Sequence, residues 1–268
     1  MENNNKETRV RSVARALTIL KCFNNPPHQL GITEISEMLQ LSKGTVHLLV
    51  KTLEDQGFVE QVPENKKYRL GSVVYELGMT AIGDLRIPSR ARLQQMNYEI
   101  VMPCYLAINI GNKAVLIEKA EPVNPFMVVM QIGAILPYHA SSMGKILLAF
   151  SDPSIRENII DTYDIQALTP NTITSRELLK SEMEKVLKQD YAVDREETLP
   201  GVFCVAVPVR DGNGRVVAAL SVVAPSTTLN SENYWKYLPV LKKYSTHITR
   251  DMSYVPRLNG ITTVGSGS

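Results

Sequence analysis

Apolar residues recur at helical spacing in two consecutive segments near the N-terminus. From Thr33 to Leu39 they lie three or four positions apart, which predicts about three turns of helix with one buried face. Ser42 matches the N-cap of a second helix, because its hydroxyl can accept from first-turn amides, and Gly57 is the expected left-handed end. The predicted buried faces hold Ile32, Ile35, Met38 and Leu39 in the first helix and Val46, Leu49, Val50 and Leu53 in the second.

The spacing changes from helical to alternating between Phe58 and Leu70. Apolar and polar residues alternate on both sides of Pro63-Glu64-Asn65, which predicts a β-hairpin. Helix, capped turn, helix and hairpin in this order indicate a winged helix-turn-helix, mainly α with a β-hairpin wing, whose second helix enters the major groove of DNA. A helical core with a solvated charged face accounts for each feature singly but not for their order.

Candidate DNA contacts follow from this arrangement. Outward side chains near the start of the second helix would face base edges, and basic side chains of the hairpin would meet phosphates. The predicted partner is double-stranded operator DNA. The predicted DNA-binding residues are Arg11, Thr33, Ser42, Lys43, Thr45, His47, Lys51, Lys67 and Arg69.

The segments on either side of this unit are also predicted to be helices. Ser12 is the predicted cap of a preceding helix, whose apolar face is expected to pack under the helix-turn-helix. This face holds Val13, Ala16, Leu17, Leu20 and Phe23. After the wing, residues 73–92 are predicted to form a helical linker that is broken near Pro88. Its apolar positions exceed what one face of a free helix needs, which indicates that a partner chain covers the remainder.

From Pro103 the period becomes that of strands, and several helices interrupt them. Gly and Asn stand at the turns of an antiparallel meander, and Asp211-Gly212-Asn213-Gly214 is a typical hairpin turn. The sequence therefore predicts an α+β domain in which helices flank an antiparallel sheet. The predicted strands are 104–111, 113–121, 126–133, 191–194, 203–210 and 215–223, and the predicted helices are 142–150, 155–160, 177–188 and 234–252.

Composition narrows the class of protein. With 268 residues and 44% hydrophobic content, the chain is long enough for two cores. The net charge of +2 gives no argument for nucleic acid by itself, so that argument depends on local placement. No apolar run of about 18 residues and no signal-peptide core is present, so we expect a cytoplasmic protein without a membrane partner. Cys22, Cys104 and Cys204 are expected to be free thiols.

These patterns predict four regions in the chain. Residues 1–72 form the winged helix-turn-helix DNA-binding domain, of which residues 1–8 are expected to be disordered. Residues 73–92 form the linker helix, and residues 93–259 form the α+β domain. Residues 260–268, which end in Gly-Ser-Gly-Ser, are predicted to be a flexible tail.

Three blocks of sequence resemble the IclR family of bacterial transcription regulators, and together they span almost the whole chain. They are RSVARALTIL with the winged helix-turn-helix around TVHLLVKTLEDQGFVE, then ILPYHASSMGKILLA, and then YAVDREETLPGVFCVAVPVRDGNGRVVAALSVVAP. The resemblance implies that residues 93–259 are an effector-binding and oligomerisation domain of GAF/PAS-like α+β fold. It also implies a repressor or activator that responds to a small molecule and acts as a homodimer or homotetramer.

The resemblance further implies an effector pocket. Carried over position by position, it is lined by Leu136, Ser142, Met143, Asp194, Cys204 and Ser221. Three positions depart from the family pattern: Asp190 replaces a usual glycine, Val223 a frequent serine, and Leu48 a common arginine in the second helix. The first turn at Ser141-Ser142 is either an anion seat or an ordinary helix cap, and an anionic metabolite, a carboxylic or sugar acid, is the expected effector.

Two other kinds of chemistry, serine acylation and metal binding, are also suggested by residues in the sequence. Ser142-x-x-Lys145 matches the serine-acylation motif, which favours an acyl-transfer enzyme or sensor tethered by its N-terminal domain, but the companion motifs Ser-Asp-Asn and Lys-Thr-Gly are absent. His139, Asp194 and Cys204 have metal-ligand side chains at spacings that match no compact zinc motif. The sequence therefore predicts a transcription regulator that is not an enzyme and needs neither a metal nor another cofactor.

Overall fold

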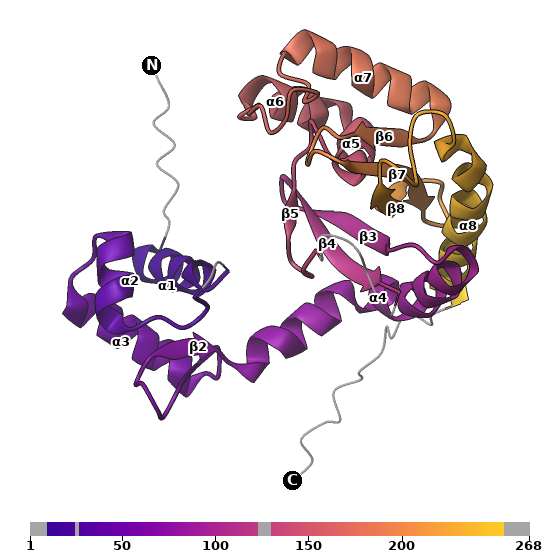
Figure 1. Cartoon of the computed structure of the whole chain (residues 1–268). Helices are drawn as coiled ribbons and strands as arrows, with labels where there is room; N and C mark the ends of the chain where they lie inside the picture. Colours follow the sequence, from indigo (N-terminus) through magenta and orange to yellow (C-terminus); the bar gives the residue numbers. More distant parts are fainter. Residues whose placement is uncertain (1–9, 25–26, 123–129, 255–268) are drawn as a thin grey trace, which may run out of the picture. The chain divides into compact units, whose positions relative to one another are not determined.

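The computed structural model describes residues 10–24, 27–122 and 130–254, without the side chains of 79–84, 86–88 and 253–254. The chain divides into two compact units, Met1–Gly83 and Asp84–Ser268, and each is described by itself (Figure 1). The predictions for residues 1–8, 126–129 and 260–268 lie outside the described residues.

The first unit is a winged helix-turn-helix, as predicted. Its elements are α1 Arg11–Cys22, α2 Ile32–Leu39, α3 Lys43–Asp55, β1 Val59–Gln61 and β2 Tyr68–Leu70, and the two strands pair antiparallel. The predicted cap at Ser42 is confirmed, since its Oγ accepts from the Thr45 amide at 3.3 Å. Gly57, with φ of +73°, has the expected left-handed conformation just after α3.

Three predictions for this unit are wrong, one about a helix cap and two about which apolar residues are buried. Val10, and not Ser12, precedes α1, and it makes no side-chain cap. Of the predicted face of α1, Phe23 is buried and Ala16 and Leu20 pack against the core. Val13 and Leu17 are instead more than half exposed, because α1 is turned so that Ile19 enters the core. Met38 is 57% exposed, since Ile35 occupies the inward side of the short helix α2.

Helix α4 runs without a break from Ser72 to Ile100, so the predicted interruption near Pro88 is wrong. A proline removes only one intrahelical hydrogen bond, and the turns on both sides remain helical here. One turn of this region has an extra bond, in which the Ser89 hydroxyl donates to the Leu85 carbonyl at 2.6 Å.

The second unit contains a six-stranded antiparallel sheet with the order β5-β4-β3-β8-β7-β6. The long β7–β8 hairpin is at the predicted place, and it stands beside the β3–β4 hairpin. The predicted strand over 126–133 is wrong in its described part, because Gly133 lies in a turn with φ of +92° and the strand starts later. The strands are β3 Cys104–Ile110, β4 Lys113–Ala120, β5 Ile135–Leu136, β6 Ala192–Arg195, β7 Val202–Arg210 and β8 Val216–Pro225.

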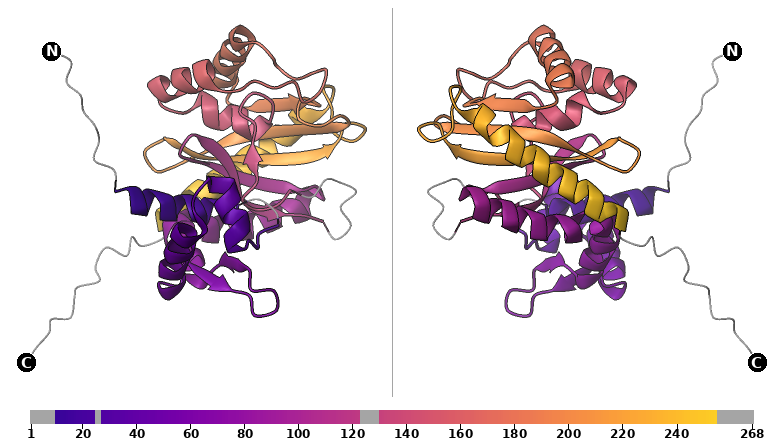
Figure 2. Two further views of the ribbon diagram at one scale, coloured as in Figure 1. Left: turned by 90° about the vertical axis from the view of Figure 1, so that its left-hand side faces the viewer. Right: turned by 90° about the vertical axis from the view of Figure 1, so that its right-hand side faces the viewer.

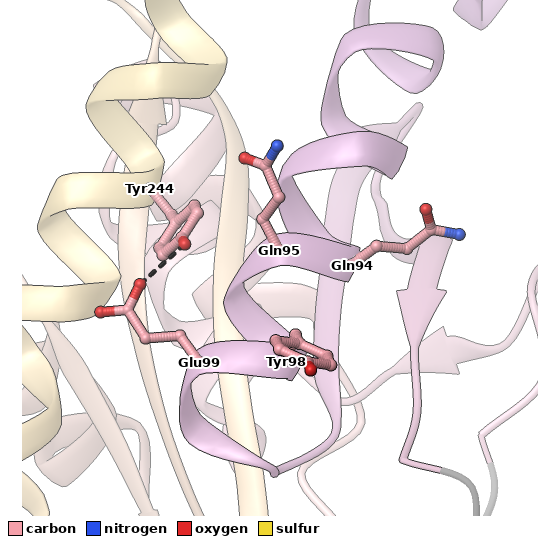
Figure 3. A pocket seen from close by; sticks show the side chains of 5 residues that line it. All are labelled: Gln94, Gln95, Tyr98, Glu99 and Tyr244. Atoms are coloured by element: carbon pink, nitrogen blue, oxygen red, sulfur yellow. Dashed lines mark hydrogen bonds between the residues drawn. The ribbon is translucent and has the colours of Figure 1, made fainter.

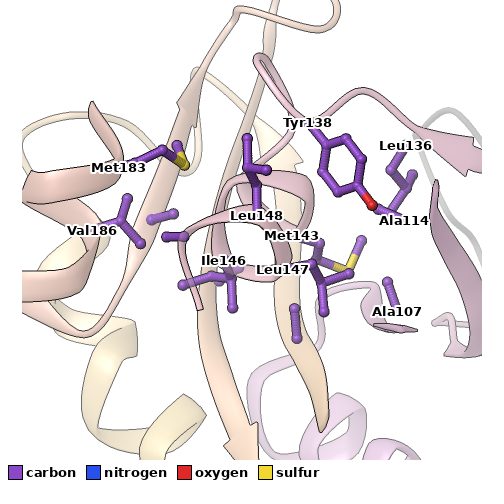
Figure 4. Packing of buried hydrophobic residues seen from close by; sticks show 14 of the residues in the cluster. Ala107, Ala114, Leu136, Tyr138, Met143, Ile146, Leu147, Leu148, Met183 and Val186 are labelled. Atoms are coloured by element: carbon purple, nitrogen blue, oxygen red, sulfur yellow. The ribbon is translucent and has the colours of Figure 1, made fainter. Parts of the chain in front are cut away.

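Helices cover both faces of this sheet (Figure 2). The α5 helix packs on one face with α7 behind it, and α8 packs on the other face near the C-terminal part of α4. Ile146 and Leu148 of α5 and Val186 of α7 belong to one core cluster with the sheet (Figure 4). The helices are α5 Ser142–Ala149, α6 Pro153–Thr162, α7 Arg176–Gln189, the 3-10 helix Tyr234–Tyr237 and α8 Leu238–Tyr254.

Among the described residues, no helix combines the length and the apolar content that crossing a lipid bilayer requires.

Candidate functional site

The start of α3 presents a group of polar side chains to the outside. Ser42 caps the helix, and its hydroxyl also shares a hydrogen bond of 2.8 Å with the Thr45 hydroxyl. Lys43 and His47 are exposed, and no hydrogen bond or ion pair is found for either side chain among the described residues. The structure therefore brings four of the predicted DNA-binding residues together at the N-terminal end of α3.

The other predicted DNA-binding residues are distributed more widely. Arg11 on α1 and Thr33 on α2 are exposed, away from the start of α3 in sequence. Lys51 Nζ lies 3.1 Å from a Glu54 oxygen and 3.4 Å from an Asp55 oxygen, toward the end of α3. These contacts raise the pKa of Lys51, and the hydrogen bond that Lys51 donates to Glu54 has the largest effect.

The two predicted residues on the wing are held in ion pairs. Lys67 Nζ lies 2.7 Å from Glu34 Oε1, and Arg69 Nε donates to Glu60 Oε1 at 2.5 Å. The hydrogen bond from Lys67 lowers the pKa of Glu34, whose other oxygen accepts from the Gly31 amide at 2.6 Å. The wing is therefore braced against the start of α2 by a partly exposed pair.

All six predicted effector-pocket residues line one cavity of about 250 Å³ in the second unit. The cavity lies between the start of α5 and the face of the sheet formed by β6, β7 and β8. Its walls are mainly apolar, with a few polar groups at defined places, which is the usual composition of a small-molecule site. The residues that line it are Met130, Leu136, Ser141, Ser142, Met143, Asp194, Thr198, Leu199, Val202, Cys204, Ser221 and Val223.

Sheet register explains why residues so distant in sequence meet. Cys204 on β7 stands opposite Asp194 on β6 and opposite Val223 on β8, so these three side chains form one row. Ser221 lies two residues before Val223 and therefore points to the same face. The Ser142 hydroxyl lies 3.4 Å from the Ser221 hydroxyl and joins α5 to the sheet.

Asp194 is the carboxyl group of this cavity, and it is 1% exposed. One of its oxygens accepts from the amides of Glu197 at 2.7 Å and Thr198 at 3.3 Å. Burial raises the pKa of Asp194, and these hydrogen bonds and the charge of Lys145 oppose the rise without cancelling it. Burial, together with the neighbouring carboxyl, also raises the pKa of the Cys204 thiol, so the thiol is neutral.

A buried ion pair lies beneath the cavity. Lys145 of α5 is fully buried, and its Nζ donates to the two Glu197 oxygens at 2.6 and 2.7 Å and to the Val193 carbonyl at 2.9 Å. A Glu182 oxygen of α7 lies 3.6 Å from the same nitrogen. The pair thus ties α5 to the segment that carries Asp194 and Thr198.

A larger recess lies on the surface between α4 and α8 (Figure 3). Its volume is about 640 Å³, and Gln94, Gln95, Tyr98, Glu99 and Tyr244 line it. The Glu99 carboxylate accepts from the Tyr244 hydroxyl and from Lys243 Nζ, each at 2.8 Å. The recess is open to solvent and contains none of the predicted site residues.

In the described part of the chain, no three His, Cys, Asp or Glu side chains are placed to hold a metal ion. The three cysteines are free, as predicted.

Comparison with protein families decides the identity of the chain. The family model for the IclR C-terminal domain of bacterial transcriptional regulators matches residues 78–250, and the model for the IclR helix-turn-helix domain matches residues 12–63. The chain belongs to the IclR family. It is therefore a DNA-binding transcription regulator that a small molecule controls through the C-terminal domain, as predicted, and not an enzyme.

Relatives and solved structures agree with this membership. The transcriptional regulator XynR of Escherichia coli is 36% identical over 247 residues, which cover 91% of this chain and 98% of XynR. A solved IclR-type regulator from Silicibacter has a TM-score of 0.81 at 26% identity, with 90% of this chain and 96% of that chain covered. An IclR homologue from Microbacterium hydrocarbonoxydans, solved with 4-hydroxybenzoate, has a TM-score of 0.80 at 24% identity, with 90% and 99% covered.

In this IclR regulator, Ser142-x-x-Lys145 does not form an acylation site. Lys145 Nζ donates to both Glu197 oxygens and to the Val193 carbonyl, so this group is engaged with them and is not positioned as a base for a serine. The Ser142 hydroxyl contacts Ser221 instead. Burial raises the pKa of Glu197, while the Lys145 charge opposes that rise.

Sequence reasoning did not assign some of the residues that line the cavity. Thr198 and Leu199 belong to the third family block, and their position directly after Asp194-Arg195-Glu196-Glu197 was an available signal. Ser141 was predicted only as part of a helix start, and its Oγ does accept from the Gly144 amide at 3.0 Å. Val202 lies two residues before Cys204, so strand alternation was an available signal for it as well. Met130 reaches the cavity through tertiary packing, for which local sequence carries no signal.

Proposed function

We propose that the cavity between α5 and the sheet binds a small carboxylic acid with an apolar body. The observation that supports this proposal is that Leu136, Ser142, Met143, Asp194, Cys204 and Ser221 all line one enclosed space of about 250 Å³. An IclR regulator needs such a site for its effector, and a cavity of this kind orients a ligand with few polar groups.

The polar groups suit one carboxylate better than a polyhydroxylated molecule. The hydroxyls of Ser142 and Ser221, with the first-turn amides of α5, can donate to a carboxylate, and the helix dipole favours negative charge there. The rest of the lining is largely apolar, so most hydroxyls of a sugar acid would lose their hydrogen bonds to water without replacement. We therefore place carboxylic acids with an apolar body ahead of sugar acids.

We further propose that the regulator acts as a homodimer and reads DNA with the start of α3. Tyr75 and Leu77 on α4 are 66% and 54% exposed, and a second copy would cover such apolar side chains. A dimer would bind a pseudo-palindrome whose half-sites lie about 10 base pairs, or a multiple of this, apart. Light scattering on the purified chain measures whether it is a homodimer. A chain that stays monomeric both with and without DNA would contradict this proposal.

The effector site is tested by thermal shift of the full chain against a panel of acids. The panel contains benzoate, 4-hydroxybenzoate, aliphatic monocarboxylates and sugar acids, and a bound acid raises the unfolding temperature by mass action. Ser142→Leu fills the cavity and should abolish the response, whereas Ser181→Leu on the exposed face of α7 should keep it. An equal response in both variants would place the site elsewhere.

DNA reading is tested by gel shift at fixed salt with an operator selected from random duplexes by the full chain. Lys43→Ala and Thr45→Ala should weaken specific binding about tenfold, because both lie at the outward start of α3. Lys113→Ala, an exposed lysine of the second unit, is the matched control. Unchanged affinity of the α3 variants would show that another surface reads the operator.

A further inference from the structure

The second turn of α3 carries a large apolar side chain that points outward. Leu48 is 69% exposed, and no other large apolar residue of this helix is exposed to that degree. The inward face is already complete, since Val46, Val50 and Leu53 fill it. Leu48 therefore contributes nothing to the core of its own unit, although exposing a leucine disfavours the free protein in water.

The side chains one turn away from Leu48 on its own face of α3 already have partners. The Thr45 hydroxyl, three residues before it, bonds with Ser42 at 2.8 Å. The Thr52 hydroxyl, one turn after it, donates to the Leu48 carbonyl at 3.0 Å, and Lys51 donates to Glu54 at 3.1 Å. Leu48 is therefore the exposed side chain on this face that has only an apolar surface to offer.

Gly44 lies one turn before Leu48 on the same helical face. A Cβ added at Gly44 would meet no atom within 4 Å, so packing inside the protein does not require glycine there. Glycine also disfavours a helix relative to alanine. The bare backbone at Gly44 leaves room for a molecule outside the helix to approach closely.

We infer that Leu48 reads the C5-methyl group of a thymine in each operator half-site, with Gly44 allowing the helix to approach the base pair closely. The thymine methyl is the apolar group that the major groove offers, and a leucine is complementary to it. This inference rests on the proposal that the start of α3 reads DNA. It predicts an A·T pair at the half-site position that faces Leu48.

The alternative partner of Leu48 is an apolar surface of another protein. DNA without the thymine methyl distinguishes these two partners, because uracil pairs like thymine and differs from it in the major groove only by that methyl group. The operator is first selected from random duplexes with the full chain. Each thymine of the selected half-site is then replaced by deoxyuridine, and dissociation constants are measured at one salt concentration.

We expect one thymine per half-site at which deoxyuridine weakens binding about fourfold, the value for burying one methyl-sized group. Leu48→Ala should lose this sensitivity while it unfolds at the same temperature as the unmodified protein, because the side chain is exposed. Leu17→Ala, an equal truncation of a leucine that is 53% exposed on α1, should keep the full deoxyuridine effect.

Leu48→Arg supplies a readout that a structural role would not give. Repeated selection with this variant should replace thymine by guanine at the same position, because arginine donates two hydrogen bonds to guanine. The inference is overturned if no thymine shows the effect, if Leu48→Ala stays as sensitive as the unmodified protein, or if the selected half-sites contain no thymine. Failure to select any sequence would instead overturn DNA reading by α3 itself.

Discussion

Lys145 shows how a charged residue is retained inside the second unit. Its ammonium is fully buried and makes short bonds to both Glu197 oxygens and to a backbone carbonyl. A buried charge is tolerated when it is paired and its remaining protons find acceptors, and removal of one partner leaves the other uncompensated. The pair therefore holds the segment after β6 at the cavity.

We predict that Lys145→Met lowers the free energy of unfolding by about 3–5 kcal/mol, because Glu197 would remain buried without its partner. The double variant Lys145→Met with Glu197→Leu should recover most of this loss, since it removes both charges. Urea denaturation followed by circular dichroism measures both effects. A double variant no more stable than the single one would contradict this account.

Asp194 allows a prediction with a defined pH dependence. Burial raises the pKa of its carboxyl in the folded protein, so its favourable effect on stability is present below the unfolded-state pKa and is lost as the pH rises through the folded-state pKa. Asp194→Asn keeps the oxygen that accepts from Glu197 and Thr198 but carries no charge.

The Asp194→Asn variant should therefore be more stable than the unmodified protein at pH 8, and the difference should shrink as the pH falls toward about 4, the pKa of a carboxyl in the unfolded chain. Urea titrations across this range measure the difference. A gap that widens on acidification would mean that the carboxyl is stabilised as the anion.

At the scale of single elements, two glycines at helix starts have opposite surroundings. A Cβ on Gly144 of α5 would lie 2.4 Å from the Pro137 carbonyl oxygen and 2.6 Å from Ser141 Oγ. A Cβ on Gly44 of α3 would meet nothing within 4 Å. The first glycine is required by packing under the helix start, and the second is not.

We predict that Gly144→Ala destabilises the second unit by about 1–3 kcal/mol, because α5 must shift to relieve the clash. Gly44→Ala should stabilise the first unit by up to about 1 kcal/mol through helix propensity. Differential scanning calorimetry measures both changes. Equal effects of the two substitutions would contradict the distinction between them.

Local signals predicted the elements better than their faces. The caps at Ser42 and Gly57 depend on residues within one turn, so the sequence was sufficient for α3. Val13 and Leu17 were misassigned because spacing identifies an apolar stripe without identifying which stripe the domain covers. The interruption at Pro88 was misassigned because proline weakens a helix by one hydrogen bond, which neighbouring turns can outweigh.

Prediction of the residues that line the cavity required two kinds of information. Six of its lining positions came from the family resemblance, and the structure places all six around one space. Val202 could have been added from alternation, since it lies two residues before Cys204 on β7. Met130 could not be predicted, because its place at the cavity results from tertiary packing. Periodicity tells which side of a strand is buried, but not which distant residue it meets.

At the scale of the whole molecule, the chain consists of two units with separate cores. One core includes Ile19, Val46 and Val50, and the other is built around α5 and the sheet. Because the proposed effector cavity is lined only by residues of the second unit, binding should stabilise that unit directly.

We predict that calorimetry of the full chain resolves two unfolding transitions. An acid found in the thermal-shift panel, added at 100 times its dissociation constant, should stabilise the second unit by about 2.7 kcal/mol. The unfolding temperature of the first unit, which Gly44→Ala is expected to raise, should not change when the acid is added. A single transition that moves as a whole with the acid would show that the two units unfold as one.

Met130 and Met143 stand in the wall of the cavity together with Cys204. Methionine side chains are unbranched and polarisable, and they change rotamer at low cost to fit the shape that is present. A wall of this kind adapts to ligands of different outline without backbone rearrangement. If this cavity is the effector site, as we propose, the same scaffold can acquire a new effector through one or two substitutions there, while the DNA-binding unit stays unchanged.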